Sequence, residues 1–217
     1  MTSKLFHTSF WAIALIFTFY ADILPYPAII AIKALPIILL LFWGLSALSG
    51  KLRIGVTAAL IASAAGDVFL AMRADLFIPG LASFLVAQLI YAFIFWSRRK
   101  TDQHRKWLVV GFIPLVLIVG SIVLPASEEL LIPVTAYLVA ISLMVIGAAL
   151  SDRPWQWVYM GAFIFAISDS LIAINKFVIP ISNAELWIML FYYLAQYLMV
   201  SGIIRGEKRR AVPRNEL

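Results

Sequence analysis

Long apolar stretches separated by short polar breaks run along the whole chain. A helix needs about 20 apolar residues to cross a bilayer, and charged residues, Pro and Gly divide the sequence into eight stretches of about that length. Because the breaks are short, consecutive helices should be antiparallel in one bundle. The expected helices cover residues 6–23, 26–48, 54–72, 80–96, 107–124, 131–150, 155–174 and 185–204.

The composition places this bundle in a membrane. Of the 217 residues, 64% are hydrophobic and 13% are charged, and the mean hydropathy is +0.99, which is far outside the range of soluble domains. The first apolar stretch has no small-residue cleavage site after it and is interpreted as a retained helix. We predict an all-α integral membrane protein of eight transmembrane helices, with one transmembrane domain over residues 1–204 and a basic cytoplasmic tail over 205–217.

The basic residues determine the expected orientation. Cytoplasmic segments carry an excess of Lys and Arg, and an internal N-terminus places every Lys and Arg inside except Lys33, Arg73 and Lys176. Both termini are therefore expected in the cytoplasm, in a multi-pass protein of the bacterial inner membrane. The net charge of +6 does not indicate nucleic-acid binding, because the basic clusters flank apolar stretches.

The two halves of the chain share short motifs. Residues 66–71, Gly-Asp-Val-Phe-Leu-Ala, are similar to residues 168–173, Ser-Asp-Ser-Leu-Ile-Ala, and residues 85–90 are similar to 193–198. These matches suggest a repeat of four plus four helices, as in several membrane folds. Short apolar matches also arise by chance in such a composition.

Two aspartates, Asp67 and Asp169, lie inside otherwise apolar stretches. A carboxyl group at membrane depth is costly unless it is paired or faces water, so it indicates a functional site by default. With about 1.5 Å per helical residue, the spacing to Arg73 and to Lys176 places both carboxyls roughly 10 Å below the outer boundary. Lys33 enters from the same side, so three ionisable groups on three helices are expected in one layer.

Other polar side chains recur at or just below this layer, which favours an interior polar pocket that opens outward. Two alternatives stay open: an aspartate could form a structural ion pair with Lys33, and the two glutamines could be interhelical hydrogen-bonding groups. The candidate substrate-binding residues are Lys33, Gln88, Tyr91, Ser168, Asn175, Tyr192 and Gln196.

The remaining composition narrows the chemistry. The chain has no Cys, and its two histidines lie outside the apolar runs, His7 before the run that begins at Phe10 and His104 in a basic connection, so no metal site and no cofactor are expected. The sequence has no Gly-x-Ser-x-Gly motif. Two carboxyl groups in different settings can divide into a general acid and a general base, because an apolar setting favours the protonated form. This division suits acid-catalysed hydrolysis through an oxocarbenium ion, with Asp67 and Asp169 as catalytic residues.

The stretches around these aspartates resemble the YhhN family of membrane proteins, which includes lysoplasmalogenases. The first stretch is Gly66 to Met72 with Phe77-Ile-Pro-Gly-Leu-Ala-Ser-Phe84 and Leu89-Ile-Tyr-Ala-Phe-Ile-Phe95. The second is Gly161 to Phe177, which contains Ser-Asp-Ser, with Tyr192-Tyr-Leu-Ala-Gln-Tyr-Leu-Met-Val-Ser-Gly202. The resemblance covers residues 33–202, which is most of the chain.

The resemblance implies hydrolysis of the vinyl ether bond of a lysoplasmalogen, giving a fatty aldehyde and glycerophosphoethanolamine or glycerophosphocholine. One aspartic acid would protonate the alkenyl β-carbon and the other carboxylate would activate water; Lys33 would contact the lipid phosphate or tune an aspartate. The chain departs from the family at Gln88, where a histidine is common, and at Lys33-Ala-Leu-Pro36, where the family often has Lys-Pro. The first departure removes a proton shuttle.

Two functions of other classes fit the same residues. A small-molecule transporter or proton-coupled permease would use the two aspartates as ion or proton sites. A non-catalytic lipid-binding membrane protein would keep the pocket and bind lysophospholipid without cleaving it. Products formed from lysolipids would discriminate the enzyme from both.

Overall fold

A computed structural model describes residues 3–72, 75–100 and 102–211, and most of this part of the chain is helical, with short connections between the helices. Arg73, one of the cations expected outside, and residues 212–217 of the expected tail lie outside the described residues. The helices are α1 (Ser3–Tyr20), α2 (Ala28–Ala47), α3 (Gly50–Ala71), α4 (Phe77–Trp96), α5 (Gln103–Ala126), α6 (Leu131–Leu150), α7 (Trp155–Phe177) and α8 (Ala184–Ala211), with short 3-10 turns at Ala21–Ile23 and Glu128–Leu130.

Local signals set several helix ends that the apolar stretches did not predict. Asp102 caps α5 by accepting a hydrogen bond from the Arg105 amide at 3.0 Å, so α5 begins before its apolar stretch. Gly50 has φ +57°, which allows the tight connection between α2 and α3. Helix α8 continues to Ala211 because Arg, Glu and Lys favour helix. The first part of the expected 205–217 tail is therefore helical.

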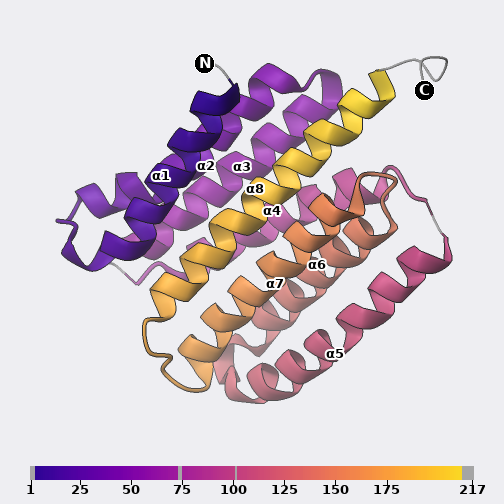
Figure 1. The fold of residues 1–217 in the computed structure, drawn as a ribbon. Coiled ribbons are helices and arrows are strands. Elements are labelled where there is room, and N and C mark those ends of the chain that lie inside the picture. The colour runs from indigo at the N-terminus through magenta and orange to yellow at the C-terminus, as the bar shows by residue number, and fades with distance from the viewer. Residues whose placement is uncertain (1–2, 73–74, 101, 212–217) are drawn as a thin grey trace.

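Helix α8 is the central element of the bundle (Figure 1). It packs most extensively on α7 and also contacts α1 and α2. Helix α3 packs between α2 and α4, α4 also packs on α6, and α5 lies at the edge against α6 and α7. The chain therefore forms one bundle in which α3, α4, α7 and α8 can bring their side chains together.

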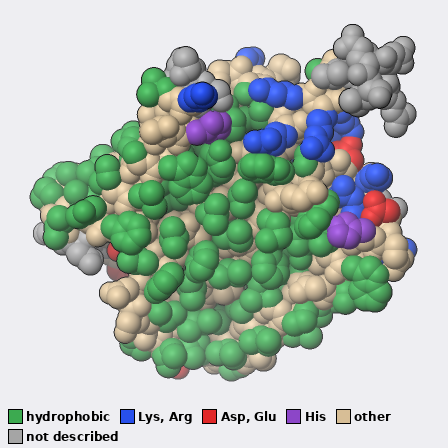
Figure 2. Space-filling view, in the orientation of Figure 1, with side chains coloured by type: hydrophobic (Ala, Val, Ile, Leu, Met, Phe, Trp, Pro, Cys, Tyr) green, Lys and Arg blue, Asp and Glu red, His purple; other side chains and the backbone are tan. Residues whose placement is uncertain are grey.

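The surface and the helix lengths are those of a multi-pass membrane protein. Seven helical segments in the described residues, all but α1, are long and apolar enough to cross a membrane. Hydrophobic side chains cover most of the face seen in Figure 2, whereas Lys and Arg gather toward the end where α8 finishes. The prediction of an all-α integral membrane protein is confirmed at this level.

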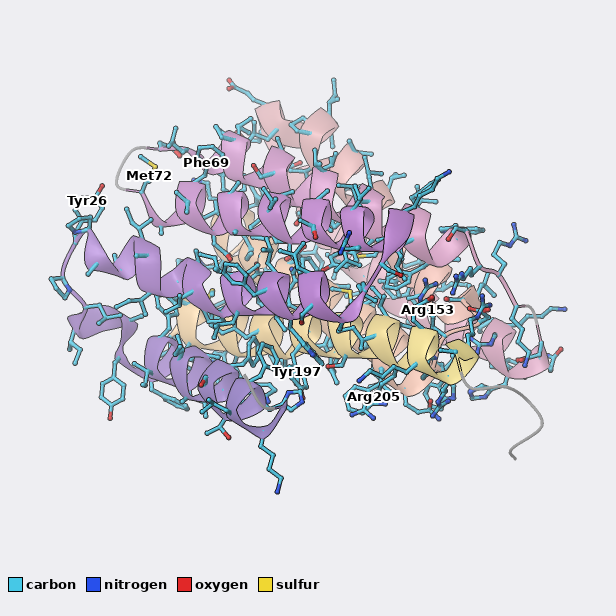
Figure 3. All side chains as sticks on the ribbon, turned by 90° about the horizontal axis from the view of Figure 1, so that it is seen from above. Tyr26, Phe69, Met72, Arg153, Tyr197 and Arg205 are labelled. Carbon is cyan, nitrogen blue, oxygen red and sulfur yellow. The ribbon has the colours of Figure 1, made fainter. Side chains whose placement is uncertain are left out.

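The two ends of the bundle differ in chemistry. Arg153 and Arg205 lie at one end, which we call the basic end, and Tyr26, Phe69 and Met72 lie at the other, which we call the distal end (Figure 3).

Close contact between α7 and α8 depends on Gly161. A Cβ atom at this position would lie 2.8 Å from the Met199 backbone nitrogen and 2.9 Å from the Ala195 carbonyl oxygen. We expect Gly161→Ala to lower the free energy of unfolding by about 1–3 kcal/mol, because backbone atoms cannot move aside without separating the helices. Thermal unfolding in detergent measures this loss. Gly111→Ala in α5 is the control, since no atom lies within 4 Å of its added Cβ, and an equal loss in both variants would contradict the packing explanation.

Candidate active site

One cavity of about 220 Å³ collects the two intramembrane aspartates. It lies toward the distal end, and its walls come from α2, α3, α4, α7 and α8. The polar side chains that line it are Lys33, Asp67, Ser168, Asp169, Asn175, Glu185 and Tyr192. The expected layer of ionisable groups therefore forms a shared wall of one cavity.

Asp67 is buried and held by a hydrogen bond from α8. Its side chain is 2% exposed, and its Oδ2 accepts a hydrogen bond from the Tyr192 hydroxyl of α8 at 2.8 Å. The preceding residue, Gly66, lets α3 approach α4, because an added Cβ would lie 2.6 Å from the Phe84 ring. The small residue before the aspartate thus fixes the depth at which the carboxyl group enters the bundle.

Asp169 accepts hydrogen bonds from two side chains. Its Oδ2 accepts from the Gln88 side-chain amide of α4 at 2.8 Å and from the Tyr137 hydroxyl of α6 at 2.5 Å. The Oε1 atom of Gln88 is buried and has no hydrogen-bond partner among the described residues. Gln88 thus contacts one of the two aspartates directly.

Lys33 forms its ion pair with Glu185. The Lys33 Nζ atom lies 3.0 Å from Glu185 Oε1, and the two side chains are 10% and 48% exposed. An ion pair between Lys33 and an aspartate was one of the alternatives that the sequence left open, whereas the observed partner is the half-exposed glutamate at the start of α8. Because Glu185 is accessible to solvent, it can exchange Lys33 for water at little cost, and Lys33 is then available to an anion in the cavity.

The remaining predicted site residues fall into two groups. Ser168 and Asn175 line the cavity but are engaged in structure: Ser168 Oγ donates to the Ile188 carbonyl at 2.9 Å, and Asn175 Oδ1 accepts from the Ile181 amide at 2.8 Å. Tyr91 and Gln196 are not among the residues that line the cavity.

Tyr91 and Gln196 belong to a separate hydrogen-bonded chain. Tyr91 donates to Gln196 Oε1 at 3.0 Å, and Gln196 Nε2 donates to Ser63 Oγ at 3.0 Å, with all three side chains buried. This chain joins α4, α8 and α3 by interhelical hydrogen bonds.

Tyr137 and Glu185 were missed by the sequence reasoning. Tyr137 stands alone in an apolar stretch of α6 and shares no motif with the aspartates. Glu185 stands at the start of the last apolar stretch, where a charged residue marks a helix boundary. Only the packing of α6 against α7 and of α8 against α2 brings these side chains to the site.

Two apolar crevices of about 50 Å³ each also reach Asp169. One lies between α5, α6 and α7 and is lined by residues such as Val116, Leu138 and Ile141. The other lies between α3, α4, α6 and α7 and is lined by residues such as Leu81 and Phe177. Asp169 lines both crevices and the polar cavity, so it lies where apolar space meets polar space, and Tyr137 lines both crevices beside it.

Known sequences now place the chain in a family. The pattern of the YhhN family matches residues 28–203. The chain belongs to the YhhN family. Every candidate site residue lies within the matched range, and α1 precedes it.

The curated relatives of this chain include proteins named lysoplasmalogenase. A lysoplasmalogenase of Mycobacterium bovis is 31% identical over 173 residues, which are 76% of this chain and 65% of that protein. Lysoplasmalogenase TMEM86B of Homo sapiens is 30% identical over 178 residues, 81% of this chain and 75% of that protein. The chain thus spans slightly less than two thirds of the mycobacterial protein. No solved structure matches the chain significantly.

Proposed function

We propose that this protein is a membrane lysoplasmalogenase, which hydrolyses the vinyl ether bond of an alkenyl lysophospholipid. The observation that carries the proposal is that two buried carboxyl groups, Asp67 and Asp169, line one cavity beside apolar crevices. Relatives named lysoplasmalogenase at about 30% identity support it. The products would be a fatty aldehyde and glycerophosphoethanolamine or glycerophosphocholine, with no cofactor.

The positions of the polar cavity and the apolar crevices suggest one orientation for the bound lipid. The alkenyl chain would enter an apolar crevice beside Tyr137, and the glycerophospho group would occupy the polar cavity near Lys33. In this orientation the β-carbon, which belongs to the chain side of the vinyl ether, reaches Asp169 first. The ether oxygen and the glycerol then lie on the side of Asp67.

The first chemical step would be protonation of carbon. Asp169, as the acid, gives its proton to the β-carbon, and the double-bond electrons form the new C–H bond while an oxocarbenium ion develops at the α-carbon and ether oxygen. Tyr137, hydrogen-bonded to Asp169 Oδ2, positions the carboxyl group at the mouth of the crevice. The Asp67 carboxylate would stabilise the cation across the cavity.

The second step would be addition of water. Asp67 takes a proton from a water molecule as its oxygen bonds to the α-carbon, which gives a hemiacetal. The hemiacetal then collapses: its hydroxyl proton passes through cavity water to the ether oxygen, the bond between that oxygen and the α-carbon breaks, and the glycerophospho alcohol leaves as the aldehyde forms. The two aspartates end with their proton states exchanged, and transfer through cavity water restores them.

Incubation of the purified protein with alkenyl, acyl and alkyl lysolipids tests this function. Mass spectrometry should detect aldehyde from the alkenyl lipid alone, because only a vinyl ether forms an oxocarbenium ion on protonation. In D2O the aldehyde should gain one deuterium next to its carbonyl carbon. In 18O-water the glycerophospho product should contain no label, since its oxygen comes from the ether.

Cleavage of the acyl lipid, or label in the glycerophospho product, would contradict vinyl ether hydrolysis. Binding of all three lipids without any product would instead indicate a non-catalytic lipid-binding protein. Flux of a solute across proteoliposomes without aldehyde release would indicate a transporter.

Lys33 should contribute to substrate binding more than to chemistry. We expect Lys33→Gln to raise KM about tenfold at nearly unchanged kcat, the loss of one charged contact to a phosphate. Glu185→Gln should leave KM unchanged or lower it, because Lys33 would no longer be paired. Steady-state kinetics on the alkenyl lipid measure both, with the exposed Lys51→Gln as the charge control. A fall in kcat alone in Lys33→Gln would contradict this role.

We also propose the complete topology. Helix α1 would be the eighth transmembrane helix, with both termini in the cytoplasm of a bacterial cell and the bundle in the inner membrane. The support is positional: α1 begins at the end of the bundle where α8 finishes (Figure 1), and Lys and Arg gather at the basic end. At that end Arg99 lies 5.1 Å from the Trp96 ring centre and Arg205 lies 4.0 Å from that of Trp157, as at a membrane interface.

Reciprocal contacts support the proposed repeat of four plus four helices. Asp67 of α3 accepts a hydrogen bond from Tyr192 of α8, and Asp169 of α7 accepts one from Gln88 of α4. Each aspartate is thus bound by the helix that follows the other aspartate, which is the pattern expected for two related halves.

A further inference from the structure

A second polar cavity of about 340 Å³ lies at the basic end of the bundle. It is formed where α7 begins, and its walls come from the connection before α5, the start of α5, the connection between α6 and α7, and the last turns of α8. Asp169 follows Trp155 by fourteen residues on the same helix, which corresponds to about 20 Å. This cavity is therefore distinct from the candidate active site.

Positive charge dominates the cavity lining. Asp152 is the acidic side chain among the lining residues, and it pairs with Arg210. Two further acids stand nearby: Asp102 lies 3.6 Å from Arg105 and 4.0 Å from Lys100, and Glu207 pairs with Arg98. The cationic lining residues outnumber all of these carboxylates, and they are Lys100, Arg105, Arg153, Arg209 and Arg210.

Arg153 lacks a full set of acceptors. Its side chain is 2% exposed, its Nη1 donates to the Ile94 carbonyl at 3.2 Å, and its Nη2 lies 3.8 Å from Glu207 Oε1. The Nε atom is buried without a hydrogen-bond partner in the described part of the chain. Burial, and then the neighbouring Arg98, lower the pKa of Arg153 to about 10. A buried guanidinium with an unpartnered N–H loses the hydrogen bonds that water would give it. An anion in the cavity would supply the missing acceptor and the opposite charge.

The start of α7 adds backbone donors to the same cavity. Trp155 and Gln156, the first two helical residues, both line it. The first N–H groups of a helix have no acceptor within the helix, and the helix dipole favours negative charge there. Helix N-termini with nearby Arg side chains are common phosphate sites.

We propose that this cavity binds a phosphate group, carried by an anionic lipid of the adjacent leaflet or present as free phosphate. The three or more acceptor oxygens of a phosphomonoester match the forked donors of Arg and the N–H groups of α7. The exposed Lys100 and Arg209 would contact the ligand from the solvent side, and Arg153 would contact it from within. The site would operate independently of lysolipid hydrolysis.

Binding by the intact protein in detergent tests the proposal with two probes. Native mass spectrometry measures how many molecules of phosphatidic acid, compared with phosphatidylcholine, stay bound to the protein. Thermal unfolding compares the unfolding temperature in inorganic phosphate with that in chloride at equal ionic strength. The test variant is Lys100→Gln with Arg209→Gln, because both side chains are exposed and their loss should not disturb the fold. The matched control is Lys51→Gln with Arg53→Gln, which removes the same charge from exposed positions on α3 outside the cavity.

Wild-type protein and control should retain phosphatidic acid over phosphatidylcholine, and the test variant should bind it about tenfold or more weakly. If the test variant weakens only the binding of phosphatidic acid, the ligand is a lipid phosphate. If inorganic phosphate raises the unfolding temperature of the wild type and the control but not of the test variant, the ligand is the free anion. Equal weakening in the test and control variants would show general charge attraction and overturn the site. The absence of preference for either phosphate probe would also overturn it.

Discussion

Asp67→Asn and Asp169→Asn should each lower the rate of aldehyde release by about 10²–10⁴, the usual contribution of a positioned acid or base. Asparagine keeps the size of the side chain and can still occupy the hydrogen-bonding positions around Tyr192, Tyr137 and Gln88. It cannot donate or accept a proton in the reaction. The measurement is kcat on an alkenyl lysolipid, with aldehyde quantified by mass spectrometry.

Asp75→Asn is the matched control for this pair of variants. Asp75 is exposed between α3 and α4, so the same chemical change there removes a carboxylate without entering the cavity. Activity in this control should equal that of the wild type, and all three variants should elute from gel filtration as folded protein. Near-normal kcat in Asp67→Asn or in Asp169→Asn would remove that residue from the mechanism.

Tyr137→Phe and Tyr192→Phe should separate the two halves of the reaction. Each variant removes one hydroxyl that donates to a catalytic carboxyl group, and loss of one charge-assisted hydrogen bond corresponds to a fall of about 10–100-fold in kcat. Tyr137→Phe impairs the acid, so carbon protonation should limit the rate more and the solvent deuterium isotope effect should rise. Tyr192→Phe impairs water addition, so that isotope effect should fall.

Tyr159→Phe serves as the control for both tyrosine variants. Tyr159 belongs to α7 and is buried. Its hydroxyl donates to the Leu108 carbonyl of α5 at 2.9 Å and not to an aspartate. Its kcat and isotope effect should match the wild type. An isotope effect that rises in Tyr192→Phe and falls in Tyr137→Phe would reverse the assignment of acid and base.

The recurrence of apolar stretches of about 20 residues predicted most of the fold, because a helix needs about that length to cross a bilayer. The stretches at 131–150 and 155–174 agree closely with α6 and α7. The stretches at 54–72 and 107–124 began late, since α3 and α5 start in polar residues that project beyond the apolar region. Helix ends follow caps and turns, which hydropathy does not report.

The sequence predicted the charged residues of the candidate site but not the side chains that bind them. The two aspartates and Lys33 stood out because ionisable groups in apolar stretches are rare. Tyr91 and Gln196 were grouped with them by depth, but the cavity lining does not include them. Depth along a helix follows from residue number, whereas the direction of a side chain around the helix depends on which neighbours it packs against.

The sequence by itself determined that the chain is a helical membrane protein of the YhhN family with two carboxyl groups at similar depth. Tertiary structure decided which groups contact them: Tyr137 from α6, Tyr192 from α8 and Gln88 from α4. It also decided that Lys33 pairs with Glu185, 152 positions later in the chain. The physical reason is that composition and spacing act locally along one helix, but hydrogen bonds between helices depend on packing angle and rotation. Those are set by contacts such as Gly66 against Phe84 and Gly161 against Met199.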